Sequence, residues 1–107
     1  MPKYLVRGAY SQAGIKGVLK EGGSRRRDVA AALAESVGGR LESFHFAFGT
    51  HDFYALADLP VNAAALALAA TVGASGALSS FETVPLLTPE EADEAVRLSA
   101  NYRPPGA

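Results

Sequence analysis

Arg7 lies in the middle of a mostly apolar run, from Tyr4 to Tyr10. A guanidinium that is buried without a partner is costly, so a charge at this place needs a specific neighbour. One interpretation is that Arg7 lines a cavity and binds a carboxylate or an enolate, because its planar fork of donors suits such oxygens. The alternative is structural: an ion pair with Glu82 or Asp58, or a place at a sheet edge where the side chain reaches water.

A second group of chemically capable side chains lies within ten residues, from His45 to Tyr54. A histidine exchanges a proton near neutral pH, and a tyrosine donates a phenolic hydrogen bond. His51 and Asp52 are adjacent, so in a strand they point to opposite faces and do not converge on a metal ion. We therefore expect no metal; we expect His51 in or near an exposed turn and Asp52 fixing that turn through its own backbone amides. The candidate catalytic residues are Arg7, His45 and Tyr54, and Tyr10 joins these three as a candidate ligand contact. The structural alternative is a hydrogen-bonded strand histidine beside tyrosines that belong to the core.

Glycines precede three consecutive arginines at residues 22–27. Free amides at a helix start bind anions, and glycine permits close approach. Three arginines in the first helical turn oppose the helix dipole by about 0.3–1 kcal/mol unless an anion compensates. Gly23, Ser24 and Arg25 are therefore candidates for anion binding. The alternative is a solvated arginine turn, since the full phosphate-loop pattern is missing; the basic run is also too short for nucleic-acid binding.

The elements that must position these residues follow one another in the order β-α-β-β-α-β. The sequence predicts strands over 3–10, 40–48, 51–59 and 77–87, with a tight turn at Gly49-Thr50, and helices over 11–21, 24–37 and 62–74. Ser11, Ser24 and Asn62 are the expected helix caps, and Gly38 is the expected C-terminal stop. Thr88-Pro89-Glu90-Glu91 opens a short terminal helix that ends near 98. This order is typical of a ferredoxin-like α+β sandwich, as one domain over 1–98 with a flexible tail over 99–107.

The helical periodicity also predicts which side chains enter the core. In the first helix the expected buried stripe is Ile15, Val18 and Leu19, with the lysines turned outward. In the second helix it is Val29, Leu33 and Val37. In the alanine-rich third helix it is Leu66, Ala69, Ala70 and Gly73. In the second strand, strict alternation places Leu41 and Ser43 on one face and Phe44 and Phe46 on the other.

Composition excludes several classes of function. The chain has 107 residues, a net charge of −1 and no cysteine. Disulfides, thiolate nucleophiles and cysteine metal sites are therefore impossible, and the charge gives no attraction to nucleic acid or to anionic membranes. The first residues lack the pattern of a signal peptide, and the longest apolar stretch, 63–70, is too short to cross a bilayer. We expect a cytoplasmic protein without a cofactor.

The strand faces predict self-association. Both parities of the first, third and last strands carry apolar side chains, whereas a solvent-facing sheet surface should be polar. An uncovered apolar sheet face of this size usually marks an interface. We therefore expect a homodimer, or a higher oligomer built from it, in which two sheets stack face to face. The alternative is a monomer whose C-terminal helix folds over the open face.

The chain resembles the GYD-domain family of small, largely uncharacterised prokaryotic proteins. The resemblance runs over about residues 2–96 and is carried by YLVRGAY at 4–10, GVLKEGGS at 17–24, GGRLESF at 38–44, FAFG at 46–49 with Asp52, DLP at 58–60 and LLTPEE at 86–91. It implies a ferredoxin-like fold similar to that of the dimeric α+β barrel proteins. Those include cofactor-free monooxygenases, ligand-sensing regulatory domains and haem-using enzymes, so the fold alone does not select a function.

Three functional hypotheses follow. The first is a small-molecule binding or regulatory protein that holds an anionic or aromatic ligand between sheet and helices, with Arg7 as the charged anchor. The second is a cofactor-independent enzyme, monooxygenase-like or isomerase-like, in which Arg7 stabilises an anion and His45 or Tyr54 moves a proton. The third is a structural module whose sheet face simply pairs with a second copy.

Overall fold

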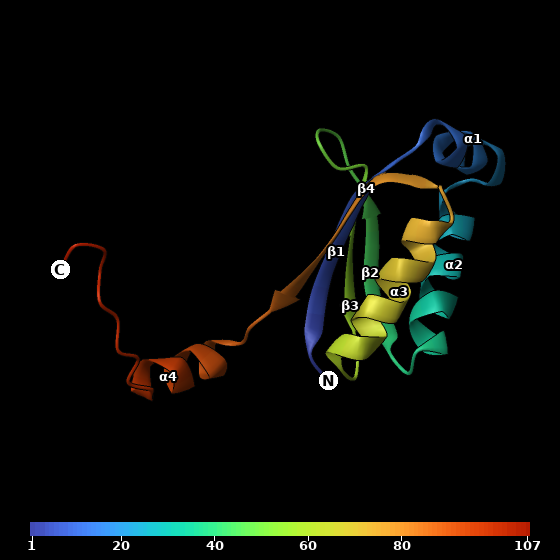
Figure 1. The fold of residues 1–107 in the computed structure, drawn as a ribbon. Helices are drawn as coiled ribbons and strands as arrows, with labels where there is room; N and C mark the ends of the chain where they lie inside the picture. The colour runs from blue at the N-terminus through green and yellow to red at the C-terminus, as the bar shows by residue number, and fades with distance from the viewer.

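The computed structural model describes residues 1–107 and contains a single sheet of four strands. The strands are β1 (Lys3–Tyr10), β2 (Arg40–Phe46), β3 (Phe53–Asp58) and β4 (Leu78–Leu86); the helices are α1 (Gln12–Glu21), α2 (Gly23–Ser36), α3 (Asn62–Ala74) and α4 (Pro89–Arg97). The strand order is β2-β3-β1-β4, and all neighbours are antiparallel. Helices α2 and α3 cover one face of the sheet and leave the other face open (Figure 1). This mixed α+β architecture is consistent with the predicted ferredoxin-like arrangement.

Local capping explains where most of the helices begin and end. The Ser11 hydroxyl accepts the amide of Gly14 and caps α1, as predicted. Gly38, with a φ of +83°, follows the C-cap of α2 in the left-handed conformation that favours glycine. The predicted capping box of α4 is also present, because Thr88 and Glu91 each accept the other's backbone amide.

Two predicted caps were wrong. Helix α2 already begins at Gly23, and its N-cap is Gly22, which adopts a φ of +87° and makes no side-chain cap. Ser24 is therefore inside the helix. The N-cap of α3 is Val61, and Asn62 is the first helical residue. The Asn62 side chain instead accepts a hydrogen bond of 2.6 Å from the hydroxyl of buried Tyr4, which ties α3 to β1.

The turn between β2 and β3 is longer than the sequence predicted. It is a loop of six residues, 47–52, rather than a tight turn at Gly49-Thr50. The amide of Ala47 donates to the carbonyl of Asp52 (2.8 Å), and the amide of Asp52 donates to the carbonyl of Gly8 (2.7 Å). The Asp52 carboxylate also accepts the amide of Tyr10 (2.9 Å). These bonds hold the loop against β1 and end both strands early. The prediction that Asp52 binds the amides of its own turn was wrong, because its carboxylate accepts the amide of Tyr10 in β1.

A bulge in β2 breaks the predicted alternation. The pairing of β2 with β3 shifts between Leu41 and Ser43. As a result Leu41 and Phe44 face the same side, opposite Ala57 and Ala55, which are buried beneath the helices. An extra residue in one strand of an antiparallel pair reverses the phase of the side chains that follow it.

The core lies between the sheet and the helices, but two of the helices bury other faces than predicted. In α3, Ala64, Ala65 and Leu68 are buried, whereas Leu66 is 70% exposed. The helix is apolar on nearly every side, so periodicity could not identify the buried face. In α1 no residue is fully buried, and Leu19 is 81% exposed.

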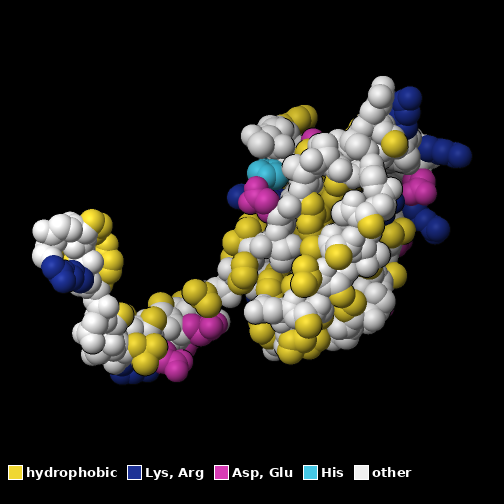
Figure 2. All heavy atoms as spheres, in the orientation of Figure 1, with side chains coloured by type: hydrophobic (Ala, Val, Ile, Leu, Met, Phe, Trp, Pro, Cys, Tyr) yellow, Lys and Arg dark blue, Asp and Glu magenta, His cyan; other side chains and the backbone are white.

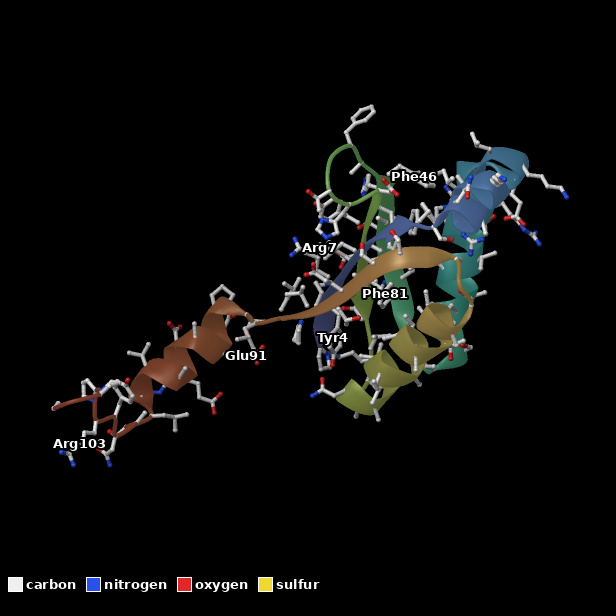
Figure 3. The ribbon with its side chains drawn as sticks, turned by 45° about the horizontal axis from the view of Figure 1, so that its top comes forward. Tyr4, Arg7, Phe46, Phe81, Glu91 and Arg103 are labelled. Atoms are coloured by element: carbon white, nitrogen blue, oxygen red, sulfur yellow. The ribbon has the colours of Figure 1, made fainter.

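The segment after β4 leaves the body of the molecule. Helix α4 lies beyond the end of β4, on the opposite side of the sheet from α2 and α3 (Figure 1). In Figure 3, Glu91 and Arg103 lie well away from Tyr4 and Arg7 of the sheet. The terminal helix therefore does not fold over the open face of its own chain, and hydrophobic side chains remain visible along it (Figure 2). No helix is long and apolar enough to cross a membrane.

Candidate functional site

A cavity of about 440 Å³ lies between the covered face of the sheet and helices α1, α2 and α3. The cavity exists because the elements around it present small side chains to each other. Helix α1 contributes Gly17, helix α2 contributes Ala30, and β3 contributes Ala55. The space that larger residues would fill is left open, and 17 of the 23 lining residues are hydrophobic.

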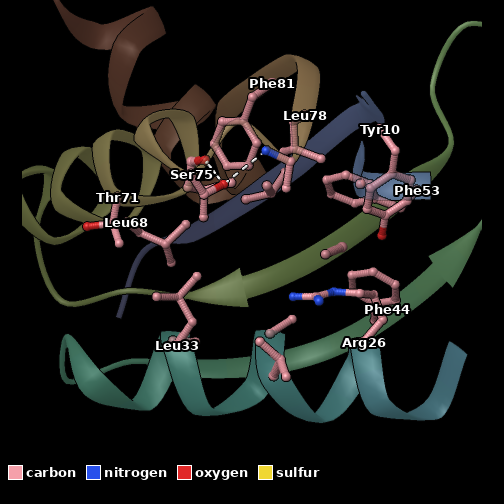
Figure 4. Close-up of a pocket in the computed structure, with 18 of the residues that line it drawn as sticks. Tyr10, Arg26, Leu33, Phe44, Phe53, Leu68, Thr71, Ser75, Leu78 and Phe81 are labelled. Atoms are coloured by element: carbon pink, nitrogen blue, oxygen red, sulfur yellow. Dashed lines mark hydrogen bonds between the residues drawn. The ribbon is translucent and has the colours of Figure 1, made fainter. Parts of the chain in front are cut away.

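One wall of the cavity is aromatic (Figure 4). Phe44 and Phe53 stack with ring centroids 5.5 Å apart and planes 6° apart. Tyr10 packs against the other side of Phe53 at 5.6 Å, with its ring tilted by 43°. The bulge in β2 is what brings Phe44 into this row. Flat aromatic surfaces of this kind suit a planar ligand, because offset stacking adds to the burial of apolar area.

Few polar groups line the cavity, and two of them make no side-chain hydrogen bond within the chain. The hydroxyls of Thr71 and Ser75 donate to the carbonyls of Ala67 and Val72 in α3. By contrast, the guanidinium of Arg26 extends into the cavity in Figure 4, and the Tyr10 hydroxyl makes no hydrogen bond within the chain. These two groups are free to bind a polar atom of a ligand.

Charged side chains of both signs lie near this end of the cavity, with Arg26 as the cation and Glu21 and Asp52 as the anions. Arg26 has a single ionic neighbour, the carboxylate of Glu21, with 3.6 Å between Nη1 and Oε2. That distance is longer than a charge-assisted hydrogen bond, which is about 2.7–2.9 Å. Burial raises the pKa of the Tyr10 phenol, and the charge of Arg26 opposes that shift. Tyr10 is thus a neutral donor at physiological pH.

The other predicted site residues lie on the open face of the sheet. In the strand register Tyr54 stands opposite Arg7 on one side and His45 on the other, and Arg7 stands opposite Glu82. The structure therefore brings Arg7, His45 and Tyr54 together. It separates them from Tyr10, whose side chain lies on the covered face of the sheet and lines the cavity. Arg7 does not reach the cavity that the first hypothesis required it to anchor.

A chain of polar contacts crosses this open face. Arg7 donates to Glu82 from Nη2 at 2.9 Å and from Nε at 3.3 Å. The other oxygen of Glu82 lies 3.3 Å from Nε2 of His51, and Nδ1 of His51 lies 3.4 Å from the hydroxyl of Tyr54. Hydrogen bonds from Arg7 and then His51 lower the pKa of the Glu82 carboxyl, and the bond to Glu82 raises the pKa of Arg7. The ion pair named as the structural alternative for Arg7 is thus present.

His51 lies in the loop over 47–52, near the turn where it was expected. Its side chain, however, is only 13% exposed and lies between Tyr54 and Glu82. If Nε2–H donates to Glu82, Nδ1 is left to accept the Tyr54 hydroxyl. The bonds that Asp52 makes to β1 fix this placement, and no pattern in the sequence signals them. The imidazole of His45, in contrast, is exposed and makes no hydrogen bond within the chain.

The candidate anion site at the start of α2 is not assembled into one group. The side chains of Ser24 and Arg25 are exposed and make no hydrogen bond or ion pair within the chain. Gly23 has a packing role, because a Cβ there would lie 2.9 Å from the ring of Phe46. It is the neighbouring Arg26 that turns into the cavity.

A third charged group, at the far end of the open face, is structural. The buried Asp58 carboxylate accepts 3.0 Å hydrogen bonds from Lys3 and from Arg40, and Lys3 also contacts Glu42. Hydrogen bonds from Lys3 and Arg40 lower the pKa of Asp58. All of its charge is compensated by protein groups, so this cluster stabilises the sheet.

Comparison with known proteins identifies one family. No group of three His, Asp or Glu side chains is close enough together to hold a metal ion. No curated protein and no solved structure matches the chain significantly. The family model of the GYD domain, however, matches residues 4–96. Because that match reaches from β1 into α4 and includes both faces described above, the chain belongs to the GYD-domain family.

Proposed function

We propose that this protein binds a small aromatic carboxylate in the cavity between sheet and helices, as a binding or regulatory protein. The observation that carries the proposal is the cavity: about 440 Å³, with mostly hydrophobic walls and a guanidinium inside. Sites for small organic ligands have volumes of about 300–1,000 Å³ and combine apolar walls with a few placed polar groups. A 107-residue chain gains nothing in stability from such an empty space, since unfilled volume costs packing energy.

The lining defines the class of ligand. A planar ring would lie along Phe44, Phe53 and Tyr10, and its carboxylate would meet Arg26 and the phenol of Tyr10. The loose contact between Arg26 and Glu21, 3.6 Å, leaves the guanidinium able to turn to a better partner. Glu21 is exposed and remains solvated when it is released. The side chain of Arg26 is 34% exposed, so water screens its interaction with an anion only in part.

The test is a thermal-shift and calorimetric titration with benzoate and naphthoate, with benzamide as the neutral analogue. A ligand at 100 times its dissociation constant adds about 2.7 kcal/mol to the unfolding free energy. We expect the carboxylates to bind more tightly than the amide. Arg26→Gln should weaken carboxylate binding about tenfold or more, the loss expected for one charge-assisted hydrogen bond. Arg25→Gln is the matched control, because Arg25 is exposed and outside the cavity. Equal loss in both variants, or no binding of any aromatic acid, contradicts the proposal.

Pairing of two copies through the open sheet face is the second part of the proposal. Leu5 stands between Leu56 and Val84 in the register, and all three are only half-buried. The charges around this apolar row already have partners, Arg7 with Glu82 and Lys3 with Asp58. A second sheet stacked on this face, as in a dimeric barrel, would therefore bury apolar area without leaving an unpaired charge.

Light scattering tests the pairing. The chain should have the mass of a dimer at micromolar concentration. Leu56→Lys on the open face should shift it to monomer, whereas Leu66→Lys on the outer surface of α3 should not. A monomeric wild-type chain, or a dimer that is indifferent to Leu56→Lys, contradicts sheet pairing.

The contact chain from Glu82 through His51 to Tyr54 favours a second candidate function, proton transfer on an enolisable substrate. A histidine oriented by a carboxylate and bonded to a hydroxyl is the arrangement by which enzymes move a proton. The test is exchange of acidic C–H groups of a panel of keto acids in D₂O, followed by NMR. Exchange above the buffer rate should be lost in His51→Gln and retained in His45→Gln, the exposed histidine of the same face. No exchange above the buffer rate rules this function out.

A further inference from the structure

The C-terminal arm, defined as residues 87–107, carries a stripe of uncovered hydrophobic side chains. Leu87, Val96, Leu98 and Tyr102 are all largely exposed. In α4 the side chains of Ala92 and Val96 lie four residues apart and share one face. The stripe is visible in yellow along the arm in Figure 2. A helix of nine residues is marginal by itself in water, even with a capping box, so α4 needs a partner surface.

The body of the same chain does not supply that surface. The arm extends beyond β4, toward the side of the sheet that α2 and α3 leave open (Figures 1 and 3). The longest dimension of the chain, 57 Å, is well above the other two, 33 and 24 Å. The arm therefore has no partner surface within its own chain, and it projects toward the space that a copy stacked on the open face would occupy.

A receiving surface is present at the opposite end of the body. There the β2–β3 loop presents the fully exposed ring of Phe48, and α1 presents Leu19 beside Lys16 and Lys20. Several Lys and Arg side chains lie on the α1 and α2 side of the body in Figure 2, and others lie on the arm itself. The arm is acidic in its first helical turns, with carboxylates at 90, 91, 93 and 94. An acidic helix with an apolar stripe and a basic surface with exposed apolar rings complement each other in charge and hydrophobicity.

We propose that two copies of this chain exchange their C-terminal arms. The arm of each copy packs across the end of the other copy that carries Phe48 and Leu19. A two-fold axis that crosses the strands relates the ends in this way, so both contacts form at once and the assembly closes as a dimer. The inference deepens the proposed pairing of the open sheet faces, on which it rests, by naming a second contact between the same two molecules.

A matched pair of leucines tests the arm. Leu98 on the arm and Leu66 on α3 are 72% and 70% exposed in the single chain, so aspartate at either position removes little buried area from the monomer; Leu66→Asp also costs helix propensity, since Leu66 lies inside α3. In the exchanged dimer Leu98 is buried and Leu66 is not. The two-fold symmetry buries Leu98 in both copies. We expect Leu98→Asp to raise the dimer dissociation constant about tenfold or more in sedimentation equilibrium, and Leu66→Asp to leave it unchanged.

A crosslink gives the location independently of stability. The chain has no native cysteine, so chains that carry Phe48→Cys and chains that carry Leu98→Cys can be mixed and treated with a bismaleimide. Arm exchange predicts a mixed crosslinked dimer, and a Leu66→Cys chain in place of Leu98→Cys should give none.

The outcomes separate this inference from sheet pairing. If Leu56→Lys dissociates the dimer while Leu98→Asp behaves as Leu66→Asp does and no mixed crosslink forms, the sheets pair and arm exchange is wrong. If the wild-type chain is a monomer, both proposals are wrong, and the stripe is left for a different protein. A dimer that Leu98→Asp weakens and Leu56→Lys does not would support the arm and overturn the sheet contact on which we have placed it.

Discussion

Replacement of Gly17 by leucine separates a real cavity from an apparent one. Gly17 lies in the interior of α1 and lines the cavity, and no atom lies within 4 Å of the position that a Cβ would take. Its backbone is helical, so an ordinary side chain fits without strain. The leucine side chain would therefore enter space that the native protein leaves open.

The expected magnitude has two parts. Replacing glycine in a helix interior with a good helix former is worth about 1 kcal/mol. Burying a leucine side chain against apolar walls is worth about 1.5–3 kcal/mol more. We therefore expect the free energy of unfolding to rise by about 1 kcal/mol in Gly17→Ala and by about 2.5–4 kcal/mol in Gly17→Leu. For a domain of about this size each kcal/mol raises Tm by about 4–8 °C.

Urea denaturation and calorimetry measure the stability, and a benzoate titration measures the site in the same samples. Gly73→Leu is the matched control: Gly73 is also helical and has no neighbour at its Cβ position, but it lies outside the cavity. Gly73→Leu should raise the free energy of unfolding by no more than the gain in helix propensity, and it should leave benzoate binding unchanged. Gly17→Leu should weaken benzoate binding strongly, because its side chain occupies the ligand's space.

Two results would refute the reasoning. A Gly17→Leu protein that is no more stable than Gly17→Ala would mean that helix and sheet close together in solution and leave no cavity. A Gly17→Leu protein that is clearly stabilised yet binds benzoate as the wild type does would mean that the cavity is real but is not the ligand site.

Three further changes test the packing and the charges around the site. Gly14→Ala should destabilise the chain by about 1–3 kcal/mol in urea titrations, because the new Cβ would overlap the carbonyl of Ala77; a gain like that of Gly17→Ala would contradict the close approach of α1 to that carbonyl. Tyr4→Phe should cost about 1 kcal/mol through loss of the hydrogen bond to Asn62, measured by the same titration, and an unchanged midpoint would show that the bond is worth nothing. Hydrogen bonds from Lys3 and Arg40 lower the pKa of Asp58 in the folded chain below its ordinary value of 3.8, so its stabilising effect is present above that pH and is lost as the pH falls through the lower, folded value. Asp58→Asn should thus flatten the acid limb of the stability profile measured from pH 2 to pH 7, and an unchanged slope there would assign the limb to other carboxyls.

Features that depend on nearest neighbours in the chain were predictable. Alternation in β1 places Tyr4, Val6 and Tyr10 on one face and Arg7 on the other, and the structure agrees. The capping box at Thr88 was recognisable because both of its partners lie within one helical turn. The alternation in β1 also meant that Tyr10 and Arg7 cannot share a pocket, although both were placed in one candidate ligand site.

Features that depend on long-range packing were not predictable. The bulge beside Leu41 arises from the pairing of β2 with β3 and leaves no mark in the alternation itself. The sequence alone does not distinguish Arg26 from Arg25. Only the packing of α2 on the sheet directs the Arg26 side chain into the cavity and the Arg25 side chain into solvent. The position of His51 near a turn was predictable, but its burial between Tyr54 and Glu82 was not, because the bonds from Asp52 to β1 join residues more than 40 positions apart.

Helix α1 connects the two proposed binding events. One of its sides, with Gly14 and Gly17, closes the cavity, and the other exposes Leu19 where the partner's arm is proposed to pack. None of its residues is fully buried, and glycines weaken its interior, so it is among the least stabilised parts of the fold. A ligand that fills the cavity and an arm that covers Leu19 would each stabilise the same helix. By linkage, each would then strengthen the binding of the other, since a coupling free energy between two sites is reciprocal. Helix α1 has glycines on the side that faces the cavity and a leucine on the outer side. This is the arrangement expected of a helix that is shared by a ligand site and a dimer contact.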